Sequence, residues 1–342
     1  MIQGSSDARR ARFAILGFAS FQACVISLLY MGSNCSFSLG NLELERGELL
    51  FPLLFMVCTL VACAFAPNSA RARLTSAPVV IVSSLLMVAG SFAEQLLGTH
   101  DGTLLALEGL LVGAPCGIVF AAWGRALGGF EIEQSVPCAL IGSALGAAVC
   151  FLLGSEALPP EAELLIDVLP LLSLAFLLAM QRIGTFPSKP KDASIKPGAP
   201  KKNRFTRRLL LGTLLFGLAT GIMQTYGSDP GMDATPTLPV TLVLFILFCL
   251  AALQLFGGEG AKPALKDAPR PEGGMLAVIS RGVAFVQGSD AGPLGGTYRL
   301  SVLLLMGGFL FVEVLGDIGV PGEAVAMSGF LSLIVVLVSL FL

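Results

Sequence analysis

Four carboxylic acid side chains interrupt otherwise apolar stretches of this sequence. They are Glu94, Glu108, Asp167 and Glu313. A charge buried in hydrocarbon costs at least a few kcal/mol, so these carboxylates are candidates for binding a cation, a proton or a basic ligand. The alternative is that each side chain only reaches the water at the end of its own stretch, where the cost is small.

Other residue types that carry chemistry form no comparable pattern. The single histidine, His100, lies beside Asp101 in a short polar segment, and no nucleophile has a readable spacing from it. There is no HExxH sequence and no phosphate-binding loop. The eight cysteines are scattered and are typical of small packing residues rather than metal ligands. The sequence therefore predicts a protein that is not an enzyme and that carries no cofactor or metal.

The four carboxylates must be positioned by helices that cross a membrane. Hydrophobic residues make up 55% of the 342 residues and charged residues only 13%, about half of the charged fraction of a soluble domain. Apolar stretches of about 20 residues are long enough to span a bilayer as helices. Ten such stretches are present, at 13–32, 49–66, 77–97, 103–123, 136–154, 163–180, 209–226, 238–256, 300–315 and 325–342.

The basic residues predict how these spans are oriented. With the N-terminus in the cytoplasm and alternating spans, 20 of the 21 Lys and Arg residues fall on the cytoplasmic side, and Arg46 alone falls outside. Cytoplasmic loops are enriched in Lys and Arg, so this partition supports the orientation. The same topology places Glu94, Glu108, Asp167 and Glu313 in the outer half of the membrane, where we expect them to line an acidic vestibule.

The chain divides into two helical parts. Residues 1–185 are expected to form a six-helix bundle, 186–208 a basic cytoplasmic linker, and 209–342 a four-helix bundle. The Pro-, Lys- and Ser-rich linker is typical of an extended segment that contacts anionic lipid, and we expect it to bind no nucleic acid. Similar residues in the first and seventh spans indicate a parallel repeat. Since the last span runs to Leu342, we expect two helices of a six-plus-six arrangement to be missing.

Small residues recur every four positions in three of the spans. Gly109, Gly113 and Gly117 lie on the fourth, and the pairs 142 and 146 and 217 and 221 lie on the fifth and seventh. Glycines at this spacing let two helix backbones approach closely, so we expect them to mark helix-packing seams.

The six-span half followed by a basic loop and further spans resembles the major facilitator superfamily. The signature loop of that family has the form GxxxDxxGR, whereas residues 67–74 here keep Arg71 and Arg73 but lack the Asp and the glycines. This departure disfavours an ordinary transport cycle. The sequence Trp123-Gly124-Arg125 at the end of a Gly-rich helix is similar to the membrane half of bacterial LuxR-type regulators, although Trp123 alone is typical of an anchor at the membrane interface.

The resemblance implies a polytopic sensor in the bacterial cytoplasmic membrane. We expect it to bind a small extracellular ligand and to signal to a cytoplasmic DNA-binding output domain that this sequence lacks. The alternative is a secondary transporter. No Lys or Arg lies deep within a predicted span, which favours a neutral or cationic solute over an anion.

Overall fold

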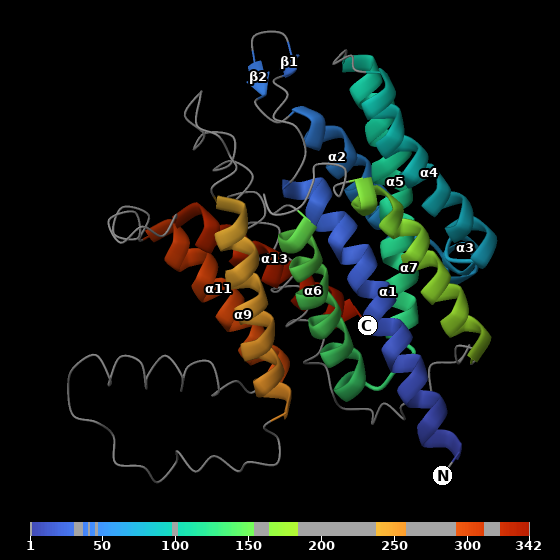
Figure 1. Cartoon of the computed structure of the whole chain (residues 1–342), viewed down its shortest axis with the longest axis vertical. Coiled ribbons are helices and arrows are strands. Elements are labelled where there is room, and N and C mark those ends of the chain that lie inside the picture. The colour runs from blue at the N-terminus through green and yellow to red at the C-terminus, as the bar shows by residue number, and fades with distance from the viewer. Residues whose placement is uncertain are drawn as a thin grey trace.

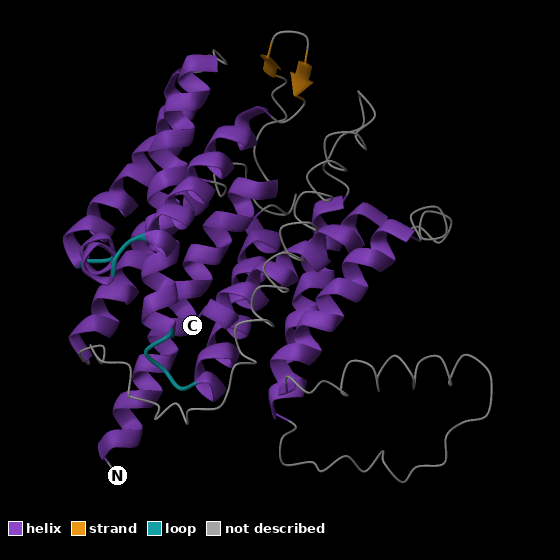
Figure 2. Ribbon diagram, turned by 180° about the vertical axis from the view of Figure 1, so that it is seen from behind, coloured by secondary structure: helices purple, strands orange, loops and turns teal. Residues whose placement is uncertain are grey.

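The computed structural model describes residues 2–30, 37–39, 42–44, 47–97, 102–153, 164–183, 237–257, 292–310 and 322–341. This part of the chain is helical apart from one short hairpin (Figures 1 and 2). The helices are α1 (Ile2–Tyr30), α2 (Gly47–Phe65), α3 (Asn68–Leu74), α4 (Ala77–Leu97), α5 (Gly102–Leu127), α6 (Ile132–Leu153), α7 (Leu164–Ile183), α9 (Thr237–Gly257), α11 (Gly292–Leu310) and α13 (Gly322–Phe341).

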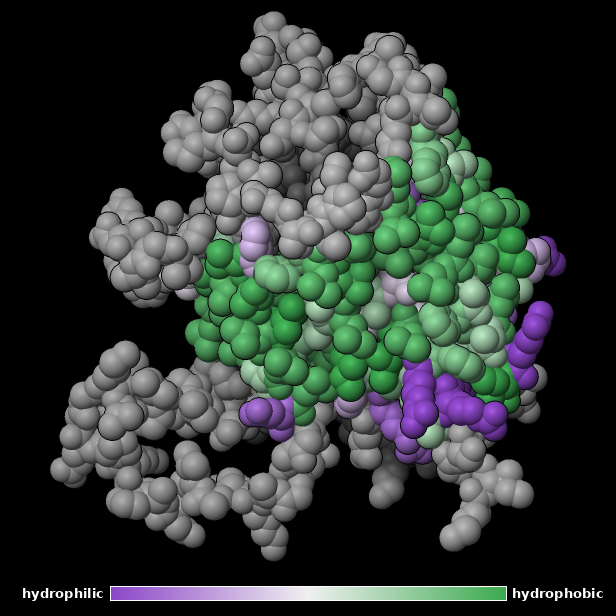
Figure 3. Space-filling view, in the orientation of Figure 1, coloured by the Kyte–Doolittle hydropathy of each residue, from purple (hydrophilic) through white to green (hydrophobic). Residues whose placement is uncertain are grey.

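These helices have the character of an integral membrane protein. Within the described residues, four segments are long and apolar enough to cross a bilayer by length and composition, namely Ala8–Leu28, Gly109–Leu127, Gln134–Leu153 and Leu164–Ile183. Shorter apolar helices lie at Phe51–Cys63, Ala77–Phe92, Pro239–Gln254 and Ala324–Val336. Large apolar side chains cover much of the outer surface, and Phe65 is 86% exposed. Figure 3 shows this apolar belt, with polar residues gathered below it at the end where α1 begins.

Helices occupy the predicted spans wherever the chain is described, and the predicted span at 209–226 lies outside the described residues. The ninth predicted span begins at 300, and α11 begins earlier, at Gly292. Pro293 follows as its second residue, a place where the missing N–H of proline costs nothing. Arg299 therefore lies about two turns inside α11 and is partly buried.

Two short elements join the long helices. The segment that corresponds to the signature loop of the facilitator family, residues 67–74, contains the short helix α3 at Asn68–Leu74, because Ala and Arg are strong helix formers. Between α1 and α2, β1 (Phe37–Leu39) pairs antiparallel with β2 (Leu42–Leu44). The intervening sequence Gly40-Asn41 is typical of a two-residue hairpin turn.

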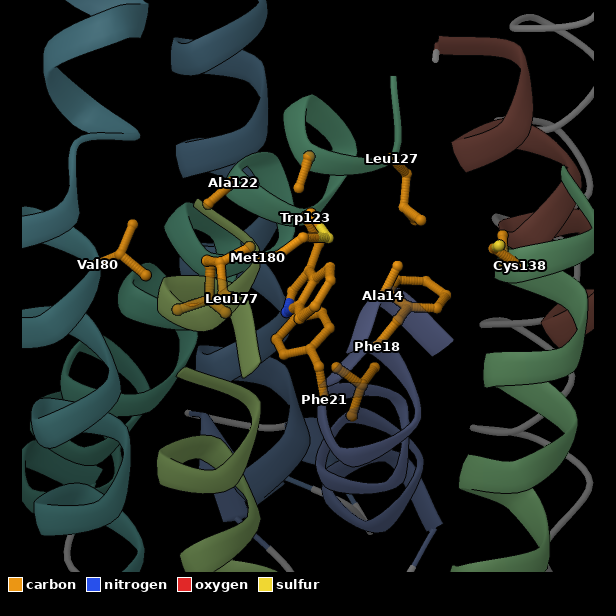
Figure 4. Close-up of a cluster of buried hydrophobic side chains, with 14 of the residues drawn as sticks. Ala14, Phe18, Phe21, Val80, Ala122, Trp123, Leu127, Cys138, Leu177 and Met180 are labelled. Atoms are coloured by element: carbon orange, nitrogen blue, oxygen red, sulfur yellow. The ribbon is translucent and has the colours of Figure 1, made fainter. Parts of the chain in front are cut away.

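Two apolar clusters hold the described helices together. The first joins α1, α4, α5 and α7 around Phe18, Phe21 and Trp123 (Figure 4). The second joins α1 and α6 to α9 and α13 around Ile26, Phe245 and Phe248. Helix α6 thus packs on α1 on one side and on α9 on the other, and it connects the two halves of the chain.

The glycine spacing marks helix seams, as predicted. On α5, Gly113 lies against the backbone of Pro52 and Gly117 lies 3.0 Å, measured from an ideal Cβ, from the Met56 carbonyl oxygen of α2. On α6, Gly142 and Gly146 lie against α1 in the same way. Residues 217 and 221 lie outside the described part of the chain.

Candidate functional site

The predicted acidic residues lie at one end of the first bundle as far as the structure describes them. Position 94 is in the last turn of α4 and position 108 is near the start of α5. These helices run antiparallel, with Gly90 against Val112. Position 94 is one turn after Gly90 on α4, and position 108 is one turn before Val112 on α5. The backbones at 94 and 108 therefore lie level with each other.

The side chains of Glu94 and Glu108 are not among the described residues, and Glu313 lies wholly outside them. The shared acidic vestibule therefore stays a prediction. Asp167 is the described member of the set, and it lies partly exposed in the first turn of α7. A carboxylate is stabilised there by the exposed N–H groups of the helix N-terminus.

Asp167 lies within electrostatic range of a thiol of α1. Helices α1 and α7 run antiparallel, and the rings of Phe13 and Phe176 lie 5.8 Å apart near the basic end. Eleven residues further along α1, Cys24 comes level with the start of α7, close enough to Asp167 for an electrostatic interaction. Among the described residues, no three His, Cys, Asp or Glu side chains approach closely enough to hold a metal ion.

At the opposite end of the bundle, Arg71 caps α2. Its Nε donates a hydrogen bond to the Cys63 carbonyl oxygen at 3.1 Å, and its Nη2 donates one to the Ala66 carbonyl oxygen at 3.4 Å. The last carbonyls of a helix lack partners within the helix and carry partial negative charge. Arg71 therefore fastens α3 to the end of α2.

Arg125 ties the last turn of α5 to the start of α4. Its Nη1 donates a hydrogen bond of 2.9 Å to Oγ1 of Thr75, and that hydroxyl donates one of the same length to the Arg71 carbonyl oxygen. At the same end, the guanidinium of Arg10 on α1 lies 4.9 Å from the centre of the Phe130 ring. The arginines of α1, α3 and α5 thus gather at one end of the bundle.

Trp123 lies in the protein interior. The expectation that it anchors the membrane interface is wrong, because the side chain is fully buried between α1, α5 and α7 (Figure 4). Its Nε1 donates a 2.8 Å hydrogen bond to Oγ of Ser173 on α7. The edge of the indole packs where Gly17 of α1 leaves room for it.

The interior also holds uncharged polar side chains that sequence reasoning missed. Gln22 and Ser143 are almost fully buried on α1 and α6, and within the described part of the chain the Nε2 of Gln22 and the Oγ of Ser143 have no hydrogen-bond partner. A single glutamine in a long apolar helix is the signal that would have identified the first of them, because such a side chain usually needs a partner within the bundle. The Arg71 cap and the Thr75–Arg125 bond had no comparable signal, since they depend on how α2, α3 and α5 meet.

Comparisons of the chain with protein-family models, with curated proteins and with solved structures give no match.

Proposed function

We propose that the chain is a ligand-sensing membrane domain with a facilitator-like bundle. It would bind a small extracellular ligand and pass a conformational change to a cytoplasmic output domain, of the DNA-binding kind that the sequence resemblance implies. It would lie in a bacterial cytoplasmic membrane with its N-terminus inside. The lipid bilayer and the ligand are its partners in this proposal.

The repeated packing of the two halves supports the facilitator-like bundle. In the first half, α5 packs on both α2 and α4. In the second half, α13 packs on both α9 and α11, which are the helices at the corresponding places in the chain. Units that repeat in parallel and meet along one seam are typical of membrane proteins that bind a small molecule between them. Here α6 of the first half contacts both α9 and α13 of the second half.

One observation carries the sensing role, namely the position of Trp123 and Arg125 two residues apart on α5. Trp123 contacts α1 and hydrogen-bonds α7 in the interior, and Arg125 hydrogen-bonds Thr75 at the basic end. A displacement of α1 or α7 would therefore be transmitted to the end of the bundle where the arginines gather. A sensor needs such a connection between its ligand site and its output side.

The proposal is tested by comparing binding with flux. The purified chain in lipid nanodiscs is screened for a shift in Tm with a panel of neutral sugars, polyols and amides and of small amines. Any stabilising solute is then tested in radiolabelled form for uptake into proteoliposomes. A sensor is expected to be stabilised and to catalyse no uptake. Uptake above that of empty liposomes would contradict the sensing role, and so would a panel without any hit.

Transport of a cationic solute is the second candidate, and Asp167 favours it. This carboxylate lies in the first turn of α7, within electrostatic range of Cys24, and at the end of the bundle that the predicted topology makes the outer one, it would attract a cation or a proton. Asp167→Asn would then abolish uptake of a stabilising amine and leave the Tm of the free protein nearly unchanged. Unchanged uptake in this variant would argue against a role of Asp167 in transport.

A further inference from the structure

Two buried polar side chains on adjacent helices lack hydrogen-bond partners. Gln22 of α1 is 4% exposed and Ser143 of α6 is fully buried. The amide Nε2 of Gln22 and the Oγ of Ser143 have neither a partner nor accessible surface. The hydroxyls of Ser84 and Ser135 share this property. An unpaired buried polar group costs about as much free energy as a lost hydrogen bond, so it calls for an explanation.

Other buried serine hydroxyls in the described residues donate a hydrogen bond to a carbonyl oxygen of their own helix. Ser20 donates to the Leu16 carbonyl oxygen at 3.0 Å, Ser301 to that of Thr297 at 3.0 Å, and Ser332 to that of Ser328 at 2.6 Å. Each bond runs one turn back along the helix, which is the common solution for serine. Ser143 makes no such bond, so its hydroxyl is held away from its own backbone acceptors.

Gln22 and Ser143 lie at the same level of the α1–α6 seam. The helices run parallel there, since an ideal Cβ on Gly142 would lie 3.0 Å from Phe18 and one on Gly146 would lie 2.9 Å from the Cβ of Gln22. Ser143 lies between these glycines, so its backbone is level with α1 about one turn before Gln22. Helical side chains lean toward the N-terminus of their helix, so the side chain of Gln22 leans toward the level of Ser143.

The Cβ of Gln22 lies in the seam itself, 2.9 Å from an ideal Cβ on Gly146, and Ser143 is rotated about 60° from Gly146 around α6. The two side chains do not hydrogen-bond each other, because the Gln22 Nε2 and the Ser143 Oγ both lack a partner among the described residues. The seam therefore holds two separate unpaired polar groups about one helical turn apart.

The two unpaired groups are themselves neutral. Cys24, which interacts electrostatically with Asp167, is rotated about 200° from Gln22 around α1. An amide NH2 and a hydroxyl match oxygen acceptors such as carbonyl and hydroxyl groups. Neither group could offset the desolvation of a charged ligand with an opposite charge.

We infer that Gln22 and Ser143 form the closed state of a binding site for a small neutral ligand that carries hydroxyl or carbonyl oxygens. The structure shows the site sealed, and the ligand enters when α1 and α6 separate. The ligand then supplies the hydrogen bonds that the closed state lacks, so it shifts the population toward the open state. This inference rests on the proposed sensing function, for which it names the ligand class and the helices that move.

The experiment measures whether the site opens and what it admits. Ser143→Cys is compared with Ala139→Cys, which lies one turn earlier on α6 in the apolar interior and is also fully buried. Each nanodisc sample is treated with neutral hydroxyethyl methanethiosulfonate or with its cationic trimethylammonium-ethyl analogue. Modification of the introduced cysteine is read by peptide mass spectrometry, which separates it from the native thiols. Gln22→Cys reports the site from α1 if Ser143→Cys does not fold.

The neutral reagent is expected to modify position 143 at least tenfold faster than position 139, and at least tenfold faster than the cationic reagent does. Equally slow reaction at positions 143 and 139 would overturn the binding site. That result would mean that position 143 is permanently buried, or that the unpaired groups only bind a trapped water, because the reagent reaches the cysteine in neither case. Equal rates with both reagents at 143 would overturn the neutral ligand class. If position 143 is inert while a panel solute still raises Tm, the proposed sensing function stands and its ligand binds elsewhere.

Discussion

The indole of Trp123 occupies the space that a side chain on Gly17 would need. A Cβ on Gly17 would lie 2.6 Å from both Cζ2 and Cη2 of Trp123, well inside van der Waals contact. The close approach of α1 to the α5 tryptophan therefore depends on glycine at position 17, and through Ser173 it fixes α7 as well.

Gly17→Ala is expected to destabilise the protein, because the new methyl group must displace a ring that is buried on all sides. Overpacking of this kind costs about 1–3 kcal/mol. Gly124→Ala is the matched control, since a Cβ there meets nothing within 4 Å, and alanine favours helix over glycine by up to about 1 kcal/mol. Thermal unfolding in detergent measures both variants. Equal effects at the two positions would contradict the packing that we describe.

The hydrogen bond between Trp123 and Ser173 is expected to contribute modestly. Trp123→Phe removes the donor and Ser173→Ala the acceptor, and the double variant completes a cycle that isolates their coupling. Side-chain hydrogen bonds between membrane helices average about 0.6 kcal/mol, so we expect a coupling energy near that value. Phe at position 123 keeps an aromatic ring in the interior, which limits the cavity. A coupling energy of zero would show that the bond adds nothing to folding.

Much of the helical architecture could be predicted because apolar runs of spanning length leave few alternatives. The start of α4 at Ala77 and its end at Leu97 agree with the predicted span, since Thr75 and Ser76 precede it and Gly98 follows it. The helix seams could also be predicted, because glycines four residues apart lie on one face. Trp123 could not be placed correctly, because a tryptophan near the end of a span fits the interface and the interior equally well until its neighbours are known.

The candidate site was harder to predict from sequence. Carboxylates in apolar stretches draw attention because their charge is costly, but uncharged groups such as Gln22 and Ser143 cost less and carry no spacing signal. Their importance depends on two helices meeting at one level without offering partners. That relationship belongs to the tertiary structure, and the sequence of either helix alone does not show it.

Arg71 is expected to stabilise the last turn of α2. Arg71→Met keeps much of the aliphatic stem and removes the donors to the Cys63 and Ala66 carbonyl oxygens. A cation at a helix C-terminus contributes about 0.3–1 kcal/mol, so amide hydrogen exchange in the last turn of α2 should become about two- to fivefold faster. Arg73→Met is the control, because Arg73 is equally exposed on α3 and no hydrogen bond joins it to α2. Faster exchange in both variants would indicate a general effect of charge.

The orientation predicted for the protein in the membrane rests on its basic residues. The arginines of α1, α3, α5 and α7 that the structure describes lie at one end of the first bundle, and Lys and Arg mark the cytoplasmic side.

Cys35 and Lys196, which both lie outside the described residues, fall on opposite sides in this topology. In intact cells an impermeant maleimide should therefore modify Cys35, and it should leave Lys196→Cys unmodified until the cells are permeabilised. Because Cys35 is present in that variant too, each site is quantified separately by peptide mass spectrometry. Modification of Lys196→Cys in intact cells, with Cys35 protected, would reverse the orientation and place Asp167 on the cytoplasmic side.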